Sequence, residues 1–259
     1  MRYFVVADVH GFYTPMIEAL AQAGYFDYAG EKKLLMLGDL LDRGKETVQM
    51  QDFVYDLLMK NEVILVRGNH EDLLEDLVDD LAVYAELGLH YTHHYRNRTV
   101  QTVADLCRCS VGTMIEEPYQ IRSRMRQTPF MRIVMPEMHD YYETEHYVFV
   151  HGWIPMIDLS SIGQHGQFLY DPAWRDTTLD RWNKARWYNG IDAARAGILV
   201  PDKTVVCGHW HCSYGHYLDG APEEFGAGAD FSPYRADGVI AIDACTALSG
   251  KVNVLVVDD

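Results

Sequence analysis

Side chains that bind divalent cations follow five short apolar runs of this sequence. Each run is rich in Val, Leu or aromatic residues and ends close to a glycine, which indicates a buried strand. Ligands placed just beyond the carboxyl ends of strands converge on one crevice of an α/β sheet. The candidate metal ligands at these five strand ends are Asp8, His10, Asp39, Asn69, His151, His209 and His211.

Carboxylate, imidazole and carboxamide donors suit first-row cations such as Mn, Fe, Zn, Ni or Co better than calcium. Two such cations about 3.5–4 Å apart need a ligand in common, and a carboxylate bridges where a neutral imidazole does not. Asp39 is therefore the expected bridge between two divalent metal ions. The other ligands are expected to divide into Asp8, His10 and His211 for the first ion and Asn69, His151 and His209 for the second.

A proton donor and phosphate-binding groups accompany these ligands. His70 follows Asn69 and is surplus to the metal ligands, while Asp42 could accept its second ring N–H and raise its pKa. Arg43 and Arg67 lie next to the same motifs and offer forked donors to phosphate oxygens. A metal-bound water or hydroxide would attack phosphorus in line with the leaving oxygen. The residues predict phosphoryl transfer without a protein nucleophile.

Strands and helices are expected to alternate in the first part of the chain, which predicts a largely parallel sheet. The five ligand strands are predicted at residues 3–7, 34–37, 63–66, 147–150 and 204–207. Helices are predicted over about 13–23 and 46–60 and from about residue 71. Residues 239–242 and 252–257 are interpreted as two further strands joined by a turn near Ser249 and Gly250.

The strand pattern is interrupted over residues 72–145, which are expected to be mostly helical. Because the ligands run from Asp8 to His211, one site must connect most of the sequence. We therefore expect a single catalytic domain over residues 1–259, with 72–145 as a helical, cap-like insertion. The insertion begins directly after the motif that contains Asn69 and His70. We therefore expect it to lie at the rim of the site.

Bulk composition restricts the function further. The formal charge of −16 opposes general attraction to nucleic acids and anionic membranes. The sequence contains no apolar run of about eighteen residues that could span a bilayer and begins without a recognisable secretion signal, so a cytoplasmic location is expected. Five cysteines without a C-x-x-C pair argue against a disulfide framework or a structural zinc site.

Together the motifs resemble the calcineurin-like metallophosphoesterases. The similarity is to the phosphoprotein phosphatase branch, which includes bacterial and phage serine/threonine phosphatases and symmetrical diadenosine tetraphosphatases. It covers residues 1–71 and about 146–259. It rests on Asp8-Val9-His10-Gly11, Gly38-Asp39-Leu40-Leu41-Asp42-Arg43-Gly44, Arg67-Gly68-Asn69-His70-Glu71, His151-Gly152 and Gly208-His209.

The resemblance implies an α/β fold, a β-sandwich flanked by helices, with a dinuclear site on the ligands named above. It also implies that His70 is a general acid paired with Asp42. Members of the family often use one further arginine from the loop after the fourth ligand strand. Arg175 and Arg186 are the candidates for this phosphate contact.

Three functions are compatible with these residues. The leading hypothesis is a dinuclear-metal-dependent phosphatase that hydrolyses phosphate monoesters, including those of phosphorylated serine or threonine. The alternative is a phosphoanhydride or phosphodiester hydrolase of the diadenosine tetraphosphatase type. A non-catalytic metal-binding scaffold is the third. The expected partner is a phosphorylated substrate: a phosphopeptide, a nucleotide or a small phosphoester.

Overall fold

The computed structural model describes residues 1–162 and 165–259, in which two β-sheets pack face to face. The first sheet has the order β11-β1-β2-β3 and the second has the order β4-β5-β8-β10-β9. The strands of the first sheet are β1 (Arg2–Val6), β2 (Lys32–Leu37), β3 (Val63–Val66) and β11 (Leu255–Asp258). Those of the second are β4 (Tyr142–Glu143), β5 (Tyr147–Phe149), β8 (Thr204–Cys207), β9 (Tyr234–Ala236) and β10 (Val239–Ala241). A separate hairpin pairs β6 (Met156–Asp158) with β7 (Phe168–Tyr170).

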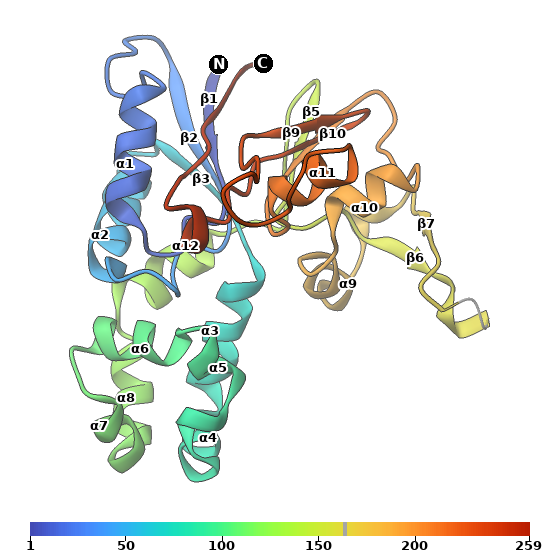
Figure 1. Cartoon of the computed structure of the whole chain (residues 1–259). Helices are drawn as coiled ribbons and strands as arrows, with labels where there is room; N and C mark the ends of the chain where they lie inside the picture. The colour runs from blue at the N-terminus through green and yellow to red at the C-terminus, as the bar shows by residue number, and fades with distance from the viewer. Residues whose placement is uncertain (163–164) are drawn as a thin grey trace.

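Helices cover the outer faces of both sheets and form a lobe below them (Figure 1). The first sheet is flanked by α1 (Tyr13–Gln22) and α2 (Thr47–Met59). The lobe consists of α3 (Asn69–Asp79), α4 (Leu81–Leu87), α5 (His93–Arg96), α6 (Thr99–Cys107), α7 (Val111–Glu116) and α8 (Pro118–Met125). The later helices are α9 (Leu179–Ala185), α10 (Gly190–Arg195), α11 (Cys212–Leu218) and α12 (Thr246–Ser249). Short turns of 3₁₀ or π type are η1 (Leu89–Tyr91), η2 (Phe130–Val134), η3 (Met135–Glu137), η4 (Leu159–Ile162) and η5 (Trp174–Asp176).

Period-two alternation explains how the first sheet is buried on both faces. In β1 the side chains of Phe4 and Val6 join a core shared with the helices, whereas Tyr3 and Val5 join the core between the sheets. Successive strand residues point to opposite faces, so a strand buried on both sides needs an unbroken apolar run. The predicted β-sandwich flanked by helices is confirmed, and the inner face of each sheet is covered by the other sheet rather than by helices.

The end of the chain differs from its sequence-based interpretation. β10 and β11 are not a pair joined by a turn: α12 lies between them, and they belong to different sheets. β10 pairs with β8 and β9, while β11 runs antiparallel to β1. The last strand therefore crosses from the second sheet to the first and brings the two chain ends side by side (Figure 1).

The segment over residues 72–145 contains all of the helical lobe except the first three residues of α3, and its last element is β4. The lobe projects below both sheets from the carboxyl end of β3, where α3 begins (Figure 1). Its role as a cap-like insertion in a single domain of residues 1–259 stays a prediction. Among the described residues, no helix has both the length and the apolar character needed to cross a bilayer. The cytoplasmic location likewise stays a prediction.

Candidate metal centre

Asp39 lies at the centre of a cluster of buried metal-binding side chains. It follows β2 and is 1% exposed. Two groups of ligand atoms share it, one with His10 and His70 and one with His151 and His209, and the atoms of each group lie within 4.8 Å of one another. Asp39 Oδ2 is 3.6 Å from His10 Nε2, and Oδ1 is 3.4 Å from His151 Nε2. Two donor sets thus meet at the two oxygens of one carboxylate.

The two sheets contribute different ligands to this cluster. Asp8 and Asp39 follow strands of the first sheet, and His151 and His209 follow strands of the second. Hydrogen bonds join the two sides: the His209 backbone N–H donates to Asp8 Oδ2 at 2.9 Å, and His151 Nδ1 donates to the Leu37 carbonyl at 2.7 Å. The site therefore requires the sandwich, because neither sheet supplies both donor sets.

Backbone conformation is unusual at these strand ends. Positive φ angles are rare for residues other than glycine and are energetically costly, so the surrounding contacts must hold them. They occur at the motif residues Asp8 (52°), His10 (46°), Asp39 (53°), Asp42 (70°), Arg43 (55°) and His209 (62°). The left-handed turns redirect the chain as each strand ends and gather side chains that would otherwise alternate between faces.

Glycines allow the ligand loops to approach one another closely. A Cβ atom on Gly38 would overlap the backbone of Gly68, and one on Gly68 would overlap Asp39 Oδ1. A Cβ atom on Gly208 would overlap Asp8 Oδ2. The glycines of the sequence motifs are therefore needed for close packing around the carboxylates.

The substitution Gly208→Ala is expected to destabilise the protein by about 1–3 kcal/mol, because the buried carboxylate of Asp8 has little room to move. It should also weaken metal binding. Urea unfolding with and without EDTA measures the first effect, and Mn²⁺ titration measures the second. Gly112→Ala in α7 is the control, because its new Cβ would meet only Ser110 Oγ at 3.5 Å. Equal stability of the two variants would contradict the packing argument.

The donor set fits divalent cations. The Nδ1 atom of His10 donates to the Leu41 carbonyl at 3.0 Å, and His151 Nδ1 is similarly engaged. Each imidazole then presents its Nε2 lone pair to the cluster. His151 Nε2 lies 2.8 Å from Asn69 Oδ1, so an imidazole lone pair and a carboxamide oxygen face each other. A divalent cation held by His151 and Asn69 would remove this conflict between two acceptors.

Charge at the site supports the same assignment. Burial lowers the pKa values of His10 and His151 and lowers that of His209 to about 3, which keeps these imidazoles neutral as metal ligands require. Burial opposes ionisation of Asp39, whereas positive charge at the site lowers its pKa below the usual value. Burial and nearby carboxylates raise the pKa of Asp8 well above its usual range. Bound cations would relieve this repulsion between carboxylates.

His70 forms a separate hydrogen-bonded unit beside the ligands. Its Nδ1 donates to Asp42 Oδ2 at 2.7 Å, and its Nε2 lies 3.1 Å from Arg43 Nη2 and 3.9 Å from Asp39 Oδ2. Burial disfavours the protonated ring, but the carboxylates of Asp39 and Asp42 outweigh burial and raise the pKa of His70 above its ordinary value. Arg43 can donate only to an unprotonated Nε2, so this arrangement holds the ring neutral on that side, and Nε2 takes up a proton when the guanidinium turns to another acceptor.

The other arginines predicted to bind phosphate are paired with carboxylates. Arg67 donates from Nε to Asp72 Oδ1 at 2.7 Å and also pairs with Glu75. Arg186, whose side chain is 2% exposed, donates to Asp72 Oδ2 at 2.9 Å and pairs with Asp140. These two guanidiniums help to join the start of the lobe to the loop after α9. The phosphate contacts of Arg67 and Arg186 stay predictions, and each guanidinium would have to share or leave its ion pairs to make them.

Arg175 and His211 also lie in other interactions. Arg175 makes a forked ion pair with Glu143, at 2.8 Å from Nε and 2.6 Å from Nη2. His211 Nε2 lies 2.7 Å from Glu224 Oε1 and belongs to neither of the two groups around Asp39. The structure therefore separates Arg175 from the other predicted site residues, whereas His211 lies close enough to the buried Asp243 to lower its pKa.

Three structural contributors were not among the residues selected from the sequence. Asp243 is buried beside Asp8, and burial raises its pKa to about 6. It follows the apolar run 239–242, so the strand-end criterion could have found it. Glu71 accepts hydrogen bonds from the Asp39, Leu40 and Gly68 backbone N–H groups at 2.8–2.9 Å, which holds two ligand loops together. The third contributor is a pair of threonines of α6, Thr99 and Thr102, which belong to no recognisable sequence motif.

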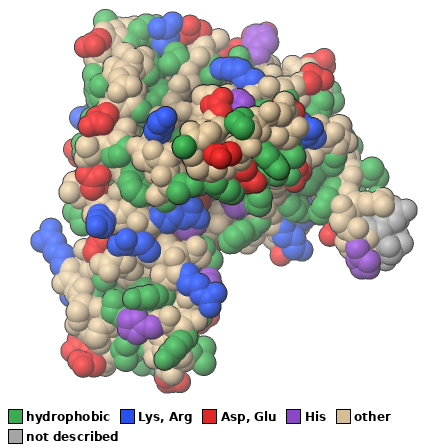
Figure 2. Space-filling view, viewed as in Figure 1, with side chains coloured by type: hydrophobic (Ala, Val, Ile, Leu, Met, Phe, Trp, Pro, Cys, Tyr) green, Lys and Arg blue, Asp and Glu red, His purple; other side chains and the backbone are tan. Residues whose placement is uncertain are grey.

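Part of the surface is basic although the chain as a whole is acidic. On the face shown in Figure 2, lysine and arginine side chains gather where the lobe meets the body of the molecule. The lobe begins at this junction with Asn69, the first residue of α3. Basic groups there favour an anionic substrate although the chain carries a formal charge of −16.

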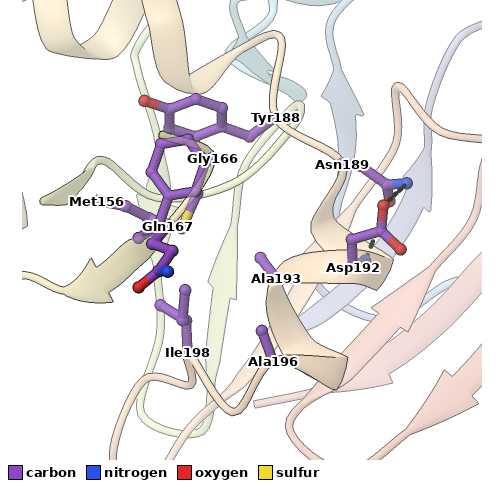
Figure 3. A pocket seen from close by; sticks show the side chains of 10 residues that line it. Met156, Gly166, Gln167, Tyr188, Asn189, Asp192, Ala193, Ala196 and Ile198 are labelled. Carbon is purple, nitrogen blue, oxygen red and sulfur yellow. Dashed lines mark hydrogen bonds between the residues drawn. The ribbon is translucent and has the colours of Figure 1, made fainter. Parts of the chain in front are cut away.

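A separate cavity of about 500 Å³ lies between the β6–β7 hairpin and α10. In Figure 3, Tyr188 and Gln167 lie on one side of it, and Ala193 of α10 and Ala196, the residue after this helix, lie on the other. None of its lining residues is a candidate metal ligand. We therefore treat this cavity as distinct from the metal centre.

Comparison with known proteins identifies the family. The family model described as calcineurin-like phosphoesterase matches residues 1–213, and the chain belongs to this family. It is therefore a metal-dependent phosphoric ester hydrolase, in agreement with the enzyme class expected from the sequence. The site residues themselves stay predictions that rest on the geometry described above.

Several curated relatives carry nucleotide hydrolase names. The asymmetrical bis(5'-nucleosyl)-tetraphosphatase PrpE of Halalkalibacterium halodurans is 25% identical over 188 residues, which is 70% of this chain and 69% of that protein. The PrpE of Bacillus velezensis is 36% identical over 76 residues, covering 27% of this chain and 30% of that protein. The symmetrical bis(5'-nucleosyl)-tetraphosphatase of a Marinomonas species is 34% identical over 71 residues, covering 27% and 24%. The latter two matches span less than a third of the relatives' length.

Solved structures support the fold. A cold-active protein-tyrosine phosphatase of a psychrophilic Shewanella species superposes with a TM-score of 0.57 at 17% sequence identity. The match covers all of this chain and 75% of that one. At this identity the similarity concerns the fold alone.

Proposed function

We propose that this protein hydrolyses a phosphoanhydride bond of a dinucleoside polyphosphate, using two divalent cations that share Asp39. The observation that carries the reaction type is the meeting of two buried donor sets on one carboxylate, next to His70. The names of the curated relatives support the substrate class. Of the reaction types considered from the sequence, they favour the diadenosine tetraphosphatase type over the phosphate monoester.

The metal ligands are proposed to act in two sets around Asp39. A pair of cations bound there supplies Lewis-acid activation of the phosphate and of the attacking water. The first set is Asp8 and His10, and the second set is Asn69, His151 and His209. His211 is assigned to neither set, because Glu224 holds its Nε2 and neither ring nitrogen belongs to the two groups of ligand atoms around Asp39. Mn, Fe, Zn, Ni and Co all remain candidates, because these donor types accept several metals.

His70 is proposed to protonate the leaving oxygen from Nε2. Asp42 holds the opposite ring nitrogen, so the ring keeps one tautomer and one orientation. Arg43 lies 3.1 Å from the same Nε2 and is placed to bind a phosphate oxygen. Arg67, Arg175 and Arg186 receive no such role here, because their guanidiniums are held by carboxylates.

The substrate is tested by a panel of compounds with Mn²⁺-saturated protein. We expect rapid cleavage of diadenosine tetraphosphate and slow release from a phosphopeptide, from p-nitrophenyl phosphate and from bis-p-nitrophenyl phosphate. Chromatography of the nucleotides distinguishes symmetrical cleavage, which yields two ADP, from asymmetrical cleavage, which yields ATP and AMP. Fast turnover of the phosphopeptide with inert diadenosine tetraphosphate would overturn the proposal.

Phosphate monoester hydrolysis is the second candidate function. It is favoured by the contact of His70 with Arg43 beside the cluster, because these two groups suit a terminal phosphate.

Trp187 provides a surface on which a nucleobase can stack. It follows α9, is 51% exposed, and its ring lies 5.9 Å from the ring of His209. Because stacking of a base on an aromatic ring contributes about 1–3 kcal/mol, Trp187→Ala should raise KM for diadenosine tetraphosphate by about tenfold. KM for p-nitrophenyl phosphate should not change, and Trp187→Phe should restore nucleotide binding. Equal changes in both KM values would indicate disturbed packing at His209 instead.

A further inference from the structure

The carboxylate of Asp42 is held by helix α6 of the lobe as well as by His70, the second residue of α3. Asp42 is 1% exposed, and both of its oxygens accept hydrogen bonds from threonine hydroxyls. Thr99 Oγ1 donates to Oδ2 at 2.7 Å, and Thr102 Oγ1 donates to Oδ1 at 2.6 Å. His70 Nδ1 donates to Oδ2 at 2.7 Å. The proposed general acid His70 and its partner Asp42 thus belong to a buried hydrogen-bonded group of four residues, which the two threonines of α6 complete.

The two threonines come from α6, which lies in the lobe. They are 57 and 60 residues from Asp42 in sequence, and their spacing of three places them on the same face of the helix. Both are fully buried or nearly so. Val100 and Val103 of the same helix are buried in the core that also contains Leu40. Apolar packing therefore determines where α6 presents its hydroxyls.

A hydroxyl on each oxygen determines the orientation of the carboxylate plane. A carboxylate held through His70 alone could rotate and change the direction of the bond that it accepts from Nδ1. Loss of a hydroxyl would leave a buried acceptor without that donor, and such a group is costly in a low-dielectric interior. The two hydroxyls therefore give each oxygen of Asp42 a hydrogen-bond donor and fix the orientation of its carboxylate plane.

We propose that Thr99 and Thr102 are positioning residues that act through Asp42 to align His70, so that the lobe completes the general-acid pair. The inference rests on the proposed role of His70 in the hydrolase. It gives residues 72–145 a direct part in the reaction, in addition to any covering of the substrate. Neither threonine touches the substrate in this proposal.

The test uses the isosteric variants Thr99→Val and Thr102→Val, alone and combined. The double variant should lower kcat for diadenosine tetraphosphate by about 10- to 100-fold with KM little changed. Thr99→Ser with Thr102→Ser should recover most of the loss. In an Asp42→Ala background the valine pair should cause no further loss, because positioning through Asp42 is then absent. An undiminished additional loss in that background would overturn the inference.

Thr47→Val is the matched control. Thr47 is equally buried, and its hydroxyl lies 3.4 Å from Asp105 of the same helix α6 instead of Asp42. The control should keep full kcat. Urea unfolding of the metal-free proteins identifies variants that merely fail to fold.

A readout independent of turnover separates this inference from the proposed function. The hydrogen-bonded Nδ1 proton of His70 in Zn²⁺-loaded protein is identified by proton NMR from its loss in His70→Asn. The valine pair should shift this signal or remove it by exchange, whereas Thr47→Val should leave it unchanged. An unchanged signal and unchanged kcat in the valine pair would refute the positioning role. Absence of hydrolysis by the wild type would refute the proposed function while the NMR result still tests the inference.

Discussion

Replacement of Asp39 by asparagine is expected to lower kcat by about 10³-fold or more and to reduce the metal content at both positions. Asp39 belongs to both donor groups, and each of its oxygens faces a different set of histidines. A carboxamide offers one oxygen and no charge, so it cannot serve both cations equally. The variant should also lose the electrostatic contribution that a buried carboxylate makes to binding two dications.

Turnover of diadenosine tetraphosphate and elemental analysis after Mn²⁺ loading measure these effects. Asp180→Asn is the control, since Asp180 is an exposed residue that pairs only with Lys184 among the described residues. It should keep wild-type activity and metal content. Full metal occupancy with normal kcat in Asp39→Asn would show that the shared centre has been placed wrongly.

Replacement of His70 by asparagine is expected to lower kcat by about 10²- to 10⁴-fold when the leaving oxygen needs a proton. The reason is that His70 supplies the imidazole held between Asp42 and Arg43. The loss should be similar for p-nitrophenyl phosphate, because p-nitrophenolate and the phosphate oxygen of a departing nucleotide are leaving groups of similar acidity. Metal content should be nearly unchanged. Lost turnover with retained metal therefore distinguishes a general acid from a metal ligand.

His146→Asn is the control for this substitution. His146 is exposed and hydrogen-bonded to Asp259, and it belongs to neither group of ligand atoms around Asp39. Its replacement should affect neither substrate. If His70→Asn lost metal together with activity, His70 would have to be reassigned as a ligand.

Local sequence determined the strands and the residues that follow them. The run from Tyr3 to Ala7 is apolar at every position, and the structure buries it on both faces. Gly38 and Gly208 mark the close approaches of the ligand loops. These features depend on side-chain alternation and steric limits within a few residues, so they can be read from neighbouring positions. The β-sandwich itself was inferred from the family resemblance.

The pairing of the last strands was decided only by the tertiary structure. β10 and β11 are both short apolar runs, and nothing in their composition distinguishes a hairpin from two strands of different sheets. The choice depends on which edge remains open after the rest of the chain has packed. Asp243, which follows β10, lies next to Asp8 because β10 pairs with β8 in the second sheet.

The partners of the charged side chains also required the tertiary structure. Arg43 and Arg67 occur in equally suggestive motifs, yet one lies beside His70 and the other pairs with Asp72. Thr99 and Thr102 carry no motif at all and reach Asp42 from a different part of the chain. Periodicity and turn chemistry act between near neighbours, so the sequence specified which groups stand at the strand ends. Long-range packing of the sandwich and the lobe decided which of those groups meet.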